Sequence, residues 1–171
     1  MSKNFNLLYV FTALVLQFFS VTSSAQSFSE AQQQKNQMIK KYGLIHSPIL
    51  NNQTNNIIQK LLLKAKCQIL DSDMVNAFAL SDGTLIISLG LLKLTQNQDQ
   101  LAHVLAHEYA HIKLGHHQEL AAFLRKPPVF FPKKKLQKLR IKQEHAADDW
   151  ANKQLSTYGF DPNQIHHLWQ Q

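Results

Sequence analysis

The sequence predicts a mainly helical α+β fold in a single domain, with a small antiparallel β-hairpin beside a histidine-rich helix. The chain has 171 residues and 44% of them are hydrophobic, which suffices for one core and hardly more. Apolar residues recur at helical spacing through most of the second half of the chain. Two short apolar runs, 75–80 and 84–89, flank Ser81-Asp82-Gly83, whose residue types favour a hairpin turn.

The composition excludes several classes of protein. A single cysteine excludes an intramolecular disulfide framework and a cysteine-rich zinc module. Five glycines and five prolines exclude collagen-like and Pro/Gly-rich disordered chains. The 18 basic and 11 acidic residues give a net charge of +7, but no nucleic-acid recognition module accompanies it, so no nucleic-acid partner is expected.

Residues 1–25 are predicted to form a secretory signal peptide. Lys3 is their only charge, Leu7 to Phe19 is a nearly continuous apolar run, and small residues end the stretch at Ala25. The run has 13 residues, whereas a membrane-spanning helix needs about 20. A retained membrane anchor is the alternative. Either reading predicts export across the inner membrane.

The elements before the histidine-rich helix follow from local patterns. Residues 26–45 form a polar N-terminal segment, predicted as a frayed tail or a polar helix, and the folded domain is expected over 46–171. Ile, Leu and Ala at helical spacing predict a helix over 51–66. A short apolar run occupies 67–70, and a short helix is expected over 91–94, after the hairpin.

The second half is predicted to hold two long helices and a short one. The first runs from about Asn97 to Leu124 and ends before Pro127-Pro128. The second spans 133–156 and is closed by Gly159, a residue typical of helix C-termini. Asp161-Pro162 then supplies a cap and a first-turn proline for a last short helix.

The first long helix contains an HExxH sequence at residues 107–111, which predicts a metal site. His107 and His111 are four positions apart, on one helical face about 6 Å apart, so two imidazoles can converge on one ion. Glu108 is rotated by about 100° and can reach a metal-activated water without being a ligand. His103 repeats the spacing but lies about 12 Å along the helix from His111, so it is expected to pack or support rather than bind the same ion.

The third ligand must come from another part of the chain. Glu144 and Asp148 are the favoured candidates because they lie four apart on one face of a separate predicted helix. One carboxylate would bind the metal and the other would accept an N–H from a ligand histidine. The other candidates are His116, His117, Glu119, His145, Asp149, His166 and His167. The first three of these are expected on or just past the histidine helix, pointing away from the site or lying beyond it.

Three sequence blocks occur in a characteristic order. They are Asn76–Leu80 with Gly83 and Gly90-Leu91-Leu92, then Leu101–His111 followed by His116, then Glu144–Asp148. This order resembles the zinc metallopeptidase family that includes the CAAX prenyl protease and HtpX, and most resembles its small secreted BepA-like periplasmic members. Ala146 and His103 depart from the family pattern, which usually has a glutamate and a small residue there.

The resemblance implies a zincin-type metalloprotease domain with one Zn²⁺ per chain. His107, His111 and Glu144 would be the zinc ligands. Glu108 would be the catalytic general base toward a metal-activated water, and Asp148 a supporting carboxylate. The implied enzyme is a zinc metalloendopeptidase.

The resemblance also implies how substrate is bound. The strand residues Asn76, Ala77, Phe78 and Ala79 would border the cleft and pair with an extended substrate. The expected function is a secreted, periplasmic endopeptidase acting on unfolded, misfolded or envelope proteins. The alternative is a zinc-bound chaperone or adaptor with little or gated proteolysis. Lys133–Lys135 are interpreted as a solvated helix face, and the alternative is contact with a membrane surface, helped by the apolar Phe130-Phe131.

Overall fold

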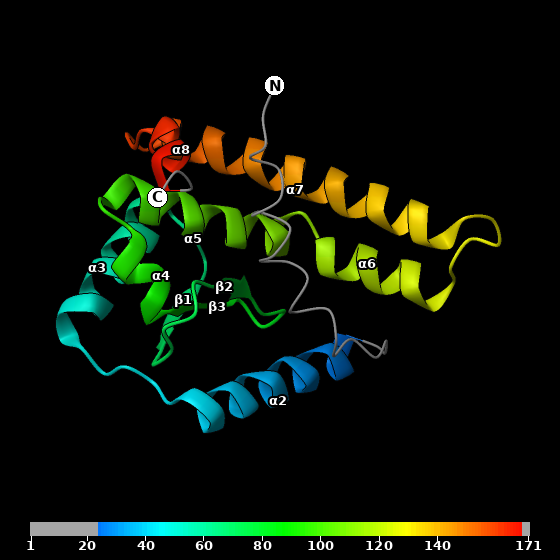
Figure 1. Cartoon of the computed structure of the whole chain (residues 1–171), viewed down its shortest axis with the longest axis horizontal. Helices are drawn as coiled ribbons and strands as arrows, with labels where there is room; N and C mark the ends of the chain where they lie inside the picture. The colour runs from blue at the N-terminus through cyan, green and yellow to red at the C-terminus, as the bar shows by residue number, and fades with distance from the viewer. Residues whose placement is uncertain (1–23, 169–171) are drawn as a thin grey trace.

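The computed structural model of the chain describes residues 24–168 (Figure 1). The predicted signal peptide therefore lies almost wholly outside the described residues. The elements are α2 Ser24–Tyr42, α3 Pro48–Lys60, β1 Lys66–Leu70, β2 Ala77–Ala79, β3 Thr84–Ser88, α4 Leu89–Leu94, α5 Gln98–Lys113, α6 His116–Arg125, α7 Pro132–Thr157, the 3₁₀ turn η2 Pro162–Gln164 and α8 Ile165–Leu168. The mainly helical α+β prediction is confirmed. None of the helices within residues 24–168 is both long and apolar enough to cross a membrane.

The sheet has three strands in the order β1-β3-β2. β2 and β3 form the predicted antiparallel hairpin, with Ala77 opposite Ile87. β1 pairs with β3 in parallel, with Lys66 opposite Thr84, so the sheet is mixed rather than purely antiparallel. The short apolar run at 67–70 did not reveal this strand, because four residues are too few to distinguish a strand from a helix by periodicity.

The two faces of the sheet are covered by different helices. Leu85 and Ile87 of β3 point into the main core, with α3, α4, α5 and the end of α7. Ile86 and Phe78 point to the opposite face, where they pack with Met38 and neighbouring residues of α2. This alternation follows from the two-residue period of a strand. The segment left open as tail or helix is thus a helix that covers one face of the sheet (Figure 1).

Two predicted helices end earlier than expected. α3 stops at Lys60 rather than residue 66, and Leu62 takes the left-handed conformation, with φ 53°. The helix predicted to run from Asn97 to Leu124 is two helices, because Gly115 adopts φ 71° between α5 and α6. A left-handed residue stops the helical hydrogen-bond ladder and redirects the chain. The remaining long helix, α7, agrees with prediction to within one residue at each end.

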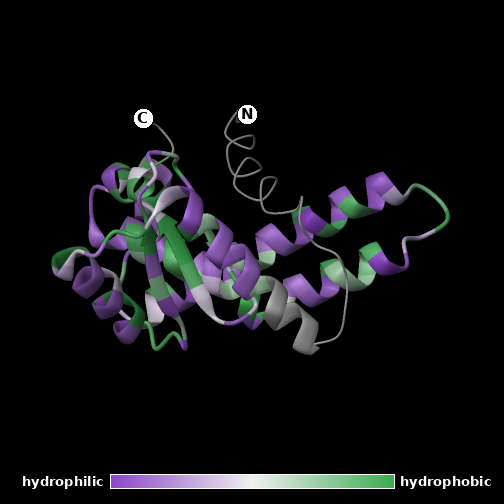
Figure 2. Ribbon diagram, turned by 90° about the horizontal axis from the view of Figure 1, so that it is seen from below, coloured by the Kyte–Doolittle hydropathy of each residue, from purple (hydrophilic) through white to green (hydrophobic). Residues whose placement is uncertain are grey.

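α5 lies between the sheet and α7 (Figure 1). Its Leu101 and Leu105 are fully buried, as are Ala147 and Ala151 of α7. The alanines lie on one face of α7, four residues apart, so the two helix backbones approach closely. The first half of α7 continues beyond this contact and forms a hairpin with α6 that extends from the body of the protein (Figure 2). The α5–α7 contact positions the candidate site.

Candidate metal centre

The first two turns of α5 fix the position of its histidines. Asn97 caps the helix, with its side-chain oxygen accepting the backbone N–H of Gln100 at 2.9 Å. The apolar face of the helix is buried against the core, and His107 and His111 follow on the side turned toward α7. There α7 presents Glu144. The side chains of His107, His111 and Glu144 are only 11–12% exposed.

The three side chains converge on one point. The Nε2 atoms of His107 and His111 are 3.2 Å apart. Glu144 places Oε2 3.4 Å from His107 Nε2 and Oε1 3.8 Å from His111 Nε2. Ligand atoms about 2.1 Å from a tetrahedral ion lie about 3.4 Å from one another. The group His107, His111 and Glu144 therefore has the spacing of a zinc ligand set.

Hydrogen bonds on the far side of each ring direct the Nε2 atoms toward this point. Asp148 places Oδ1 2.8 Å from His107 Nδ1. An ionised carboxylate only accepts, so His107 donates its Nδ1–H, and loss of the other ring proton leaves a lone pair on Nε2. His111 Nδ1 lies 3.1 Å from His116 Nδ1. In the tautomer that donates Nδ1–H to His116, His111 also directs a lone pair at the centre.

A cation would satisfy groups that are otherwise in conflict. When both rings are neutral in those tautomers, two nitrogen lone pairs face each other at 3.2 Å. Glu144 Oε2 is buried and has no hydrogen-bond partner among the described residues. An unsatisfied buried carboxylate oxygen is costly. Two imidazole nitrogens and a carboxylate are a donor set that zinc accepts, so the residues present fit this ion.

The charges around the two histidines differ. Burial opposes the charged form of His107, but the hydrogen bond to Asp148 and the nearby carboxylate of Glu144 outweigh it and raise the pKa of His107 to about 10. Burial, together with the neighbouring histidines, lowers the pKa of His111 to about 2. His111 is therefore neutral and ready to bind a metal, whereas a metal must displace a proton from His107.

Glu108 lies beside this group on the same helix. Burial raises the pKa of Glu108 to about 7, and Glu144 adds to the rise, while His107 and a hydrogen bond from the backbone of Ala79 oppose it. A carboxyl with a pKa near neutrality can both take and return a proton. The hydrogen bond also shows that the end of β2 reaches Glu108.

The strand predicted to border the cleft is an edge strand. Its neighbours in the chain bond β3, since Asn76 C=O accepts from Ser88 N–H and Leu80 N–H donates to Thr84 C=O. Hydrogen-bonding direction alternates along a strand, so the backbone groups of Ala77 and Ala79 face away from β3. Ala79 is the residue whose backbone meets Glu108.

His116 was expected to point away from the site, and that prediction was wrong. Its buried ring contacts His111 because the left-handed Gly115 turns the chain back on α5. A glycine inside a predicted helix was the signal that could have revealed this turn. His103 is buried, with its Nδ1 unpartnered among the described residues, and forms a second close group with His107 and Asp148.

The other candidate residues stay outside the centre. His145, Asp149 and His166 are exposed, and Glu119 accepts a hydrogen bond from Gln143 at the base of the α6–α7 hairpin. The side chain of His167 lies outside the described residues.

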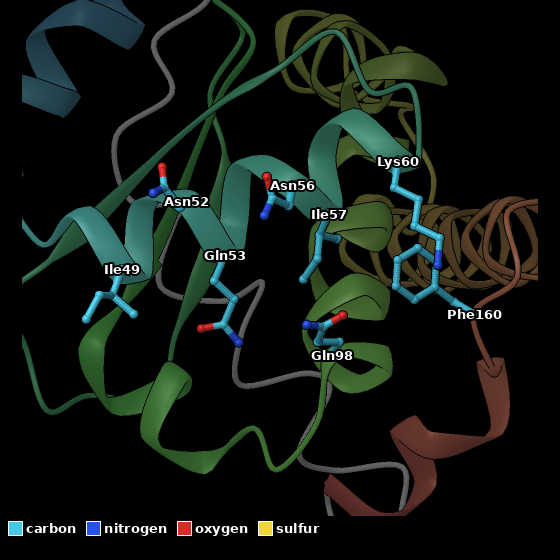
Figure 3. Close-up of a pocket in the computed structure, with 8 residues that line it drawn as sticks. All are labelled: Ile49, Asn52, Gln53, Asn56, Ile57, Lys60, Gln98 and Phe160. Atoms are coloured by element: carbon cyan, nitrogen blue, oxygen red, sulfur yellow. The ribbon is translucent and has the colours of Figure 1, made fainter.

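A pocket of about 420 Å³ lies away from the histidines. Figure 3 shows that most of its lining side chains come from α3, with Gln98 and Phe160 completing it. Gln98 is nine residues before His107, so the pocket lies about 13 Å along α5 from the candidate metal centre.

Comparison with known proteins relates the chain to peptidases. The sequence model of peptidase family M48 matches residues 45–131, about half of the chain. This range includes the sheet, α5 and α6 but ends before α7. The position of Glu144 beside the two histidines is therefore a finding of the structure alone.

Individual relatives match a shorter stretch. The chain is 31% identical over 80 residues to the beta-barrel assembly-enhancing protease of Yersinia pestis. It is 30% identical over 80 residues to the protein of the same name from Escherichia coli K12. Each match covers 43% of this chain but only 16% of the relative.

Proposed function

The chain belongs to peptidase family M48, and from this premise we propose that it is a zinc-dependent endopeptidase acting on unfolded or misfolded proteins of the cell envelope. The observation that supports the proposal best is the convergence of the His107 and His111 Nε2 atoms and the Glu144 carboxylate next to Glu108. A peptidase of this kind needs three protein ligands, an open coordination position and a nearby base. The first and the last are provided by α5 and α7.

His107, His111 and Glu144 would hold the ion, one per chain. When bound, zinc supplies a Lewis acid that makes a water more acidic and polarises the scissile carbonyl. Asp148 keeps His107 in the tautomer that binds through Nε2, and His116 does the same for His111. These two contacts hold the rings in place before the ion arrives.

Glu108 would move the proton. Its carboxylate takes a proton from the attacking water and returns it to the leaving nitrogen as the peptide C–N bond breaks. The pKa of about 7 produced by burial suits both transfers near neutral pH. Its hydrogen bond from Ala79 orients the carboxylate toward the edge of the sheet.

The edge of β2 that is turned away from β3 would bind the substrate as an added strand. The backbone groups of Ala77 and Ala79 face away from β3, and Ala79 lies at Glu108. A peptide that pairs with this edge passes the catalytic glutamate in extended form. Backbone pairing depends little on side chains but requires an extended chain, so unfolded segments are selected over folded ones.

We place this activity in the periplasm. The predicted signal peptide at residues 1–25 and the resemblance to secreted members of the family support that location. An envelope peptidase would meet proteins that fail to fold after export, which agrees with selection for extended chains.

A zinc-bound chaperone or adaptor is the second candidate. The low exposure of the three metal-binding side chains favours it, because access to the ion is narrow. The edge of β2 could still bind unfolded segments without cleaving them. In that case the metal would stabilise the fold rather than act in catalysis.

Cleavage of casein by the purified, zinc-loaded protein distinguishes the two candidates. The peptidase proposal expects cleavage that falls by about 10²- to 10⁴-fold in Glu108→Gln, since the general base is lost. Asp149→Asn is the matched control, because it removes one exposed carboxylate from α7 and should cleave normally. Absence of cleavage by both the parent and Glu108→Gln, with one zinc bound per chain, would refute the peptidase proposal in favour of the chaperone.

A further inference from the structure

The far end of the α6–α7 hairpin has an unusual combination of exposed side chains. Val129, Phe130 and Phe131 are 88%, 72% and 73% exposed at the tip. Phe131 also takes the left-handed conformation, with φ 54°. Aromatic residues are usually buried at least in part, and a contiguous exposed set marks an interaction site. The tip projects from the body of the protein, as both views show (Figures 1 and 2).

Positive charge surrounds this apolar tip. The sequence from Leu120 to Gln143 contains no Asp or Glu. Its cations are Arg125, Lys126, Lys133, Lys134, Lys135, Lys138, Arg140 and Lys142. Lys126 and Lys133 to Lys135 are exposed next to the tip, whereas Lys142 lies 3.8 Å from Glu119 at the hairpin base. The free positive charge is therefore concentrated at the end with the phenylalanines.

We propose that the hairpin tip docks this protein on an anionic lipid bilayer, with Phe130 and Phe131 inserted among the lipids and Lys133 to Lys135 on the headgroups. Apolar insertion together with adjacent cations is the combination that binds peripheral proteins to anionic membranes. An acidic soluble partner could bind through the lysines alone, and its binding would give no reason for the exposed phenylalanines.

Hydrogen bonds at the base of the hairpin join its two helices next to the metal centre. Gln143 donates to Glu119 at 2.8 Å and to the carbonyl of His116 at 3.2 Å, joining α7 to α6. Glu144 follows Phe131 by 13 residues of continuous helix, about 20 Å along its axis. A docked protein whose α7 is perpendicular to the bilayer would hold its metal centre about 20 Å from it, and any tilt would bring the centre closer. If the proposed peptidase function holds, its substrates are unfolded chains at a membrane surface.

A fluorescence measurement on the full chain tests the docking locally. Phe130→Trp places a probe at the tip, and Ile49→Trp is the matched control because Ile49 of α3 is 79% exposed on another part of the protein. The protein is mixed with vesicles of phosphatidylglycerol that have brominated acyl chains, and with vesicles of brominated phosphatidylcholine for comparison. Signals are read against the parent chain with its own tryptophans. Quenching reports on lipid only at the position of the introduced tryptophan, so it does not depend on how residues 1–25 interact with lipid.

The expected result is a blue shift and strong bromine quenching for Phe130→Trp on anionic vesicles, with neither for Ile49→Trp. Replacing Lys133, Lys134 and Lys135 with Gln in the Phe130→Trp chain should weaken vesicle binding by about fivefold per lysine, or about 100-fold in total. The matched control replaces Lys40, Lys64 and Lys66, which are exposed elsewhere, and should lower the binding far less.

Three outcomes would overturn the proposal. One is an unquenched Phe130→Trp on vesicles that do bind the chain. Another is equal quenching at positions 130 and 49. The third is the same blue shift with soluble poly-glutamate as with vesicles, which would indicate a generic polyanion site. Adding Glu108→Gln should leave quenching unchanged, so failure of docking and failure of the peptidase proposal are distinguished.

Discussion

The hydrogen bond between Asp148 and His107 gives a quantitative test of the metal centre. Asp148→Asn keeps the size of the side chain but removes the charge that holds the Nδ1–H of His107 at 2.8 Å. Loss of such a supporting partner usually lowers metal affinity by about 10- to 100-fold. Asp149→Asn is the matched control, since it removes the same charge from the adjacent, exposed position. Zinc affinity should change little in that control.

The pKa of His107 predicts how this loss depends on pH. Asp148 and Glu144 raise that pKa to about 10 against the effect of burial, so a proton competes with zinc for the ring at pH 7. Asp148→Asn lowers the pKa of His107, so it weakens the binding of the competing proton as well as the binding of zinc. The net loss of affinity should therefore be near 10-fold at pH 7 and approach 100-fold at pH 8.5, where competition is weaker.

Zinc affinity is measured by competition with a chelating indicator at both pH values, with circular dichroism to verify that each variant is folded. Equal affinities of Asp148→Asn and Asp149→Asn would refute the role of Asp148. A loss in Asp148→Asn that shrinks as the pH rises would refute the reasoning from proton competition. The same assay on His116→Phe, which removes the ring nitrogen that faces His111, should also show a loss.

Three further predictions concern stability. Gly90→Ala should lower the free energy of unfolding in urea by about 1–3 kcal/mol, because the alanine Cβ would lie 2.6 Å from Met74 O. Alanine favours helices over glycine, so a gain in stability would contradict this steric argument. Asp82→Asn should be destabilising above pH 3.8, since burial raises the pKa of Asp82 but hydrogen bonds from Thr84 and the charge of Lys35 outweigh it and lower the pKa. This difference should vanish as the pH falls through the native pKa, and a constant difference from pH 2 to 7 would contradict it. With free zinc at 100 times its Kd, removing the zinc with a chelator should lower the free energy of unfolding by about 2.7 kcal/mol. This loss should lower Tm by about 5–10 °C in differential scanning calorimetry. An unchanged Tm would contradict metal binding to the folded state.

The order of the elements and the HExxH helix could be predicted from sequence because each depends on local pattern. Apolar periodicity identified α5, Gly159 identified the end of α7, and Ser81-Asp82-Gly83 identified the hairpin. The pairing of β1 with β3 could not be predicted, because parallel pairing depends on contacts between segments distant in sequence. The end of α5 was missed for a different reason, since the apolar pattern continues through Leu114 while Gly115 changes the backbone conformation.

The turn at Gly115 connects several features of the site that look independent in the sequence. Because this residue is left-handed, α6 begins at His116, whose ring faces His111 and whose carbonyl accepts a hydrogen bond from Gln143. Gln143 immediately precedes Glu144, so the same turn supports both a histidine and the carboxylate of the candidate metal centre. A residue with a Cβ would be strained at φ 71°, and relaxing that strain would move His116 and Gln143 together. The single turn at Gly115 therefore positions the groups that support two ligands: His116, which contacts His111, and Gln143, which precedes Glu144. The spacing from HExxH to His116 and from His116 to Glu144 follows from this one turn.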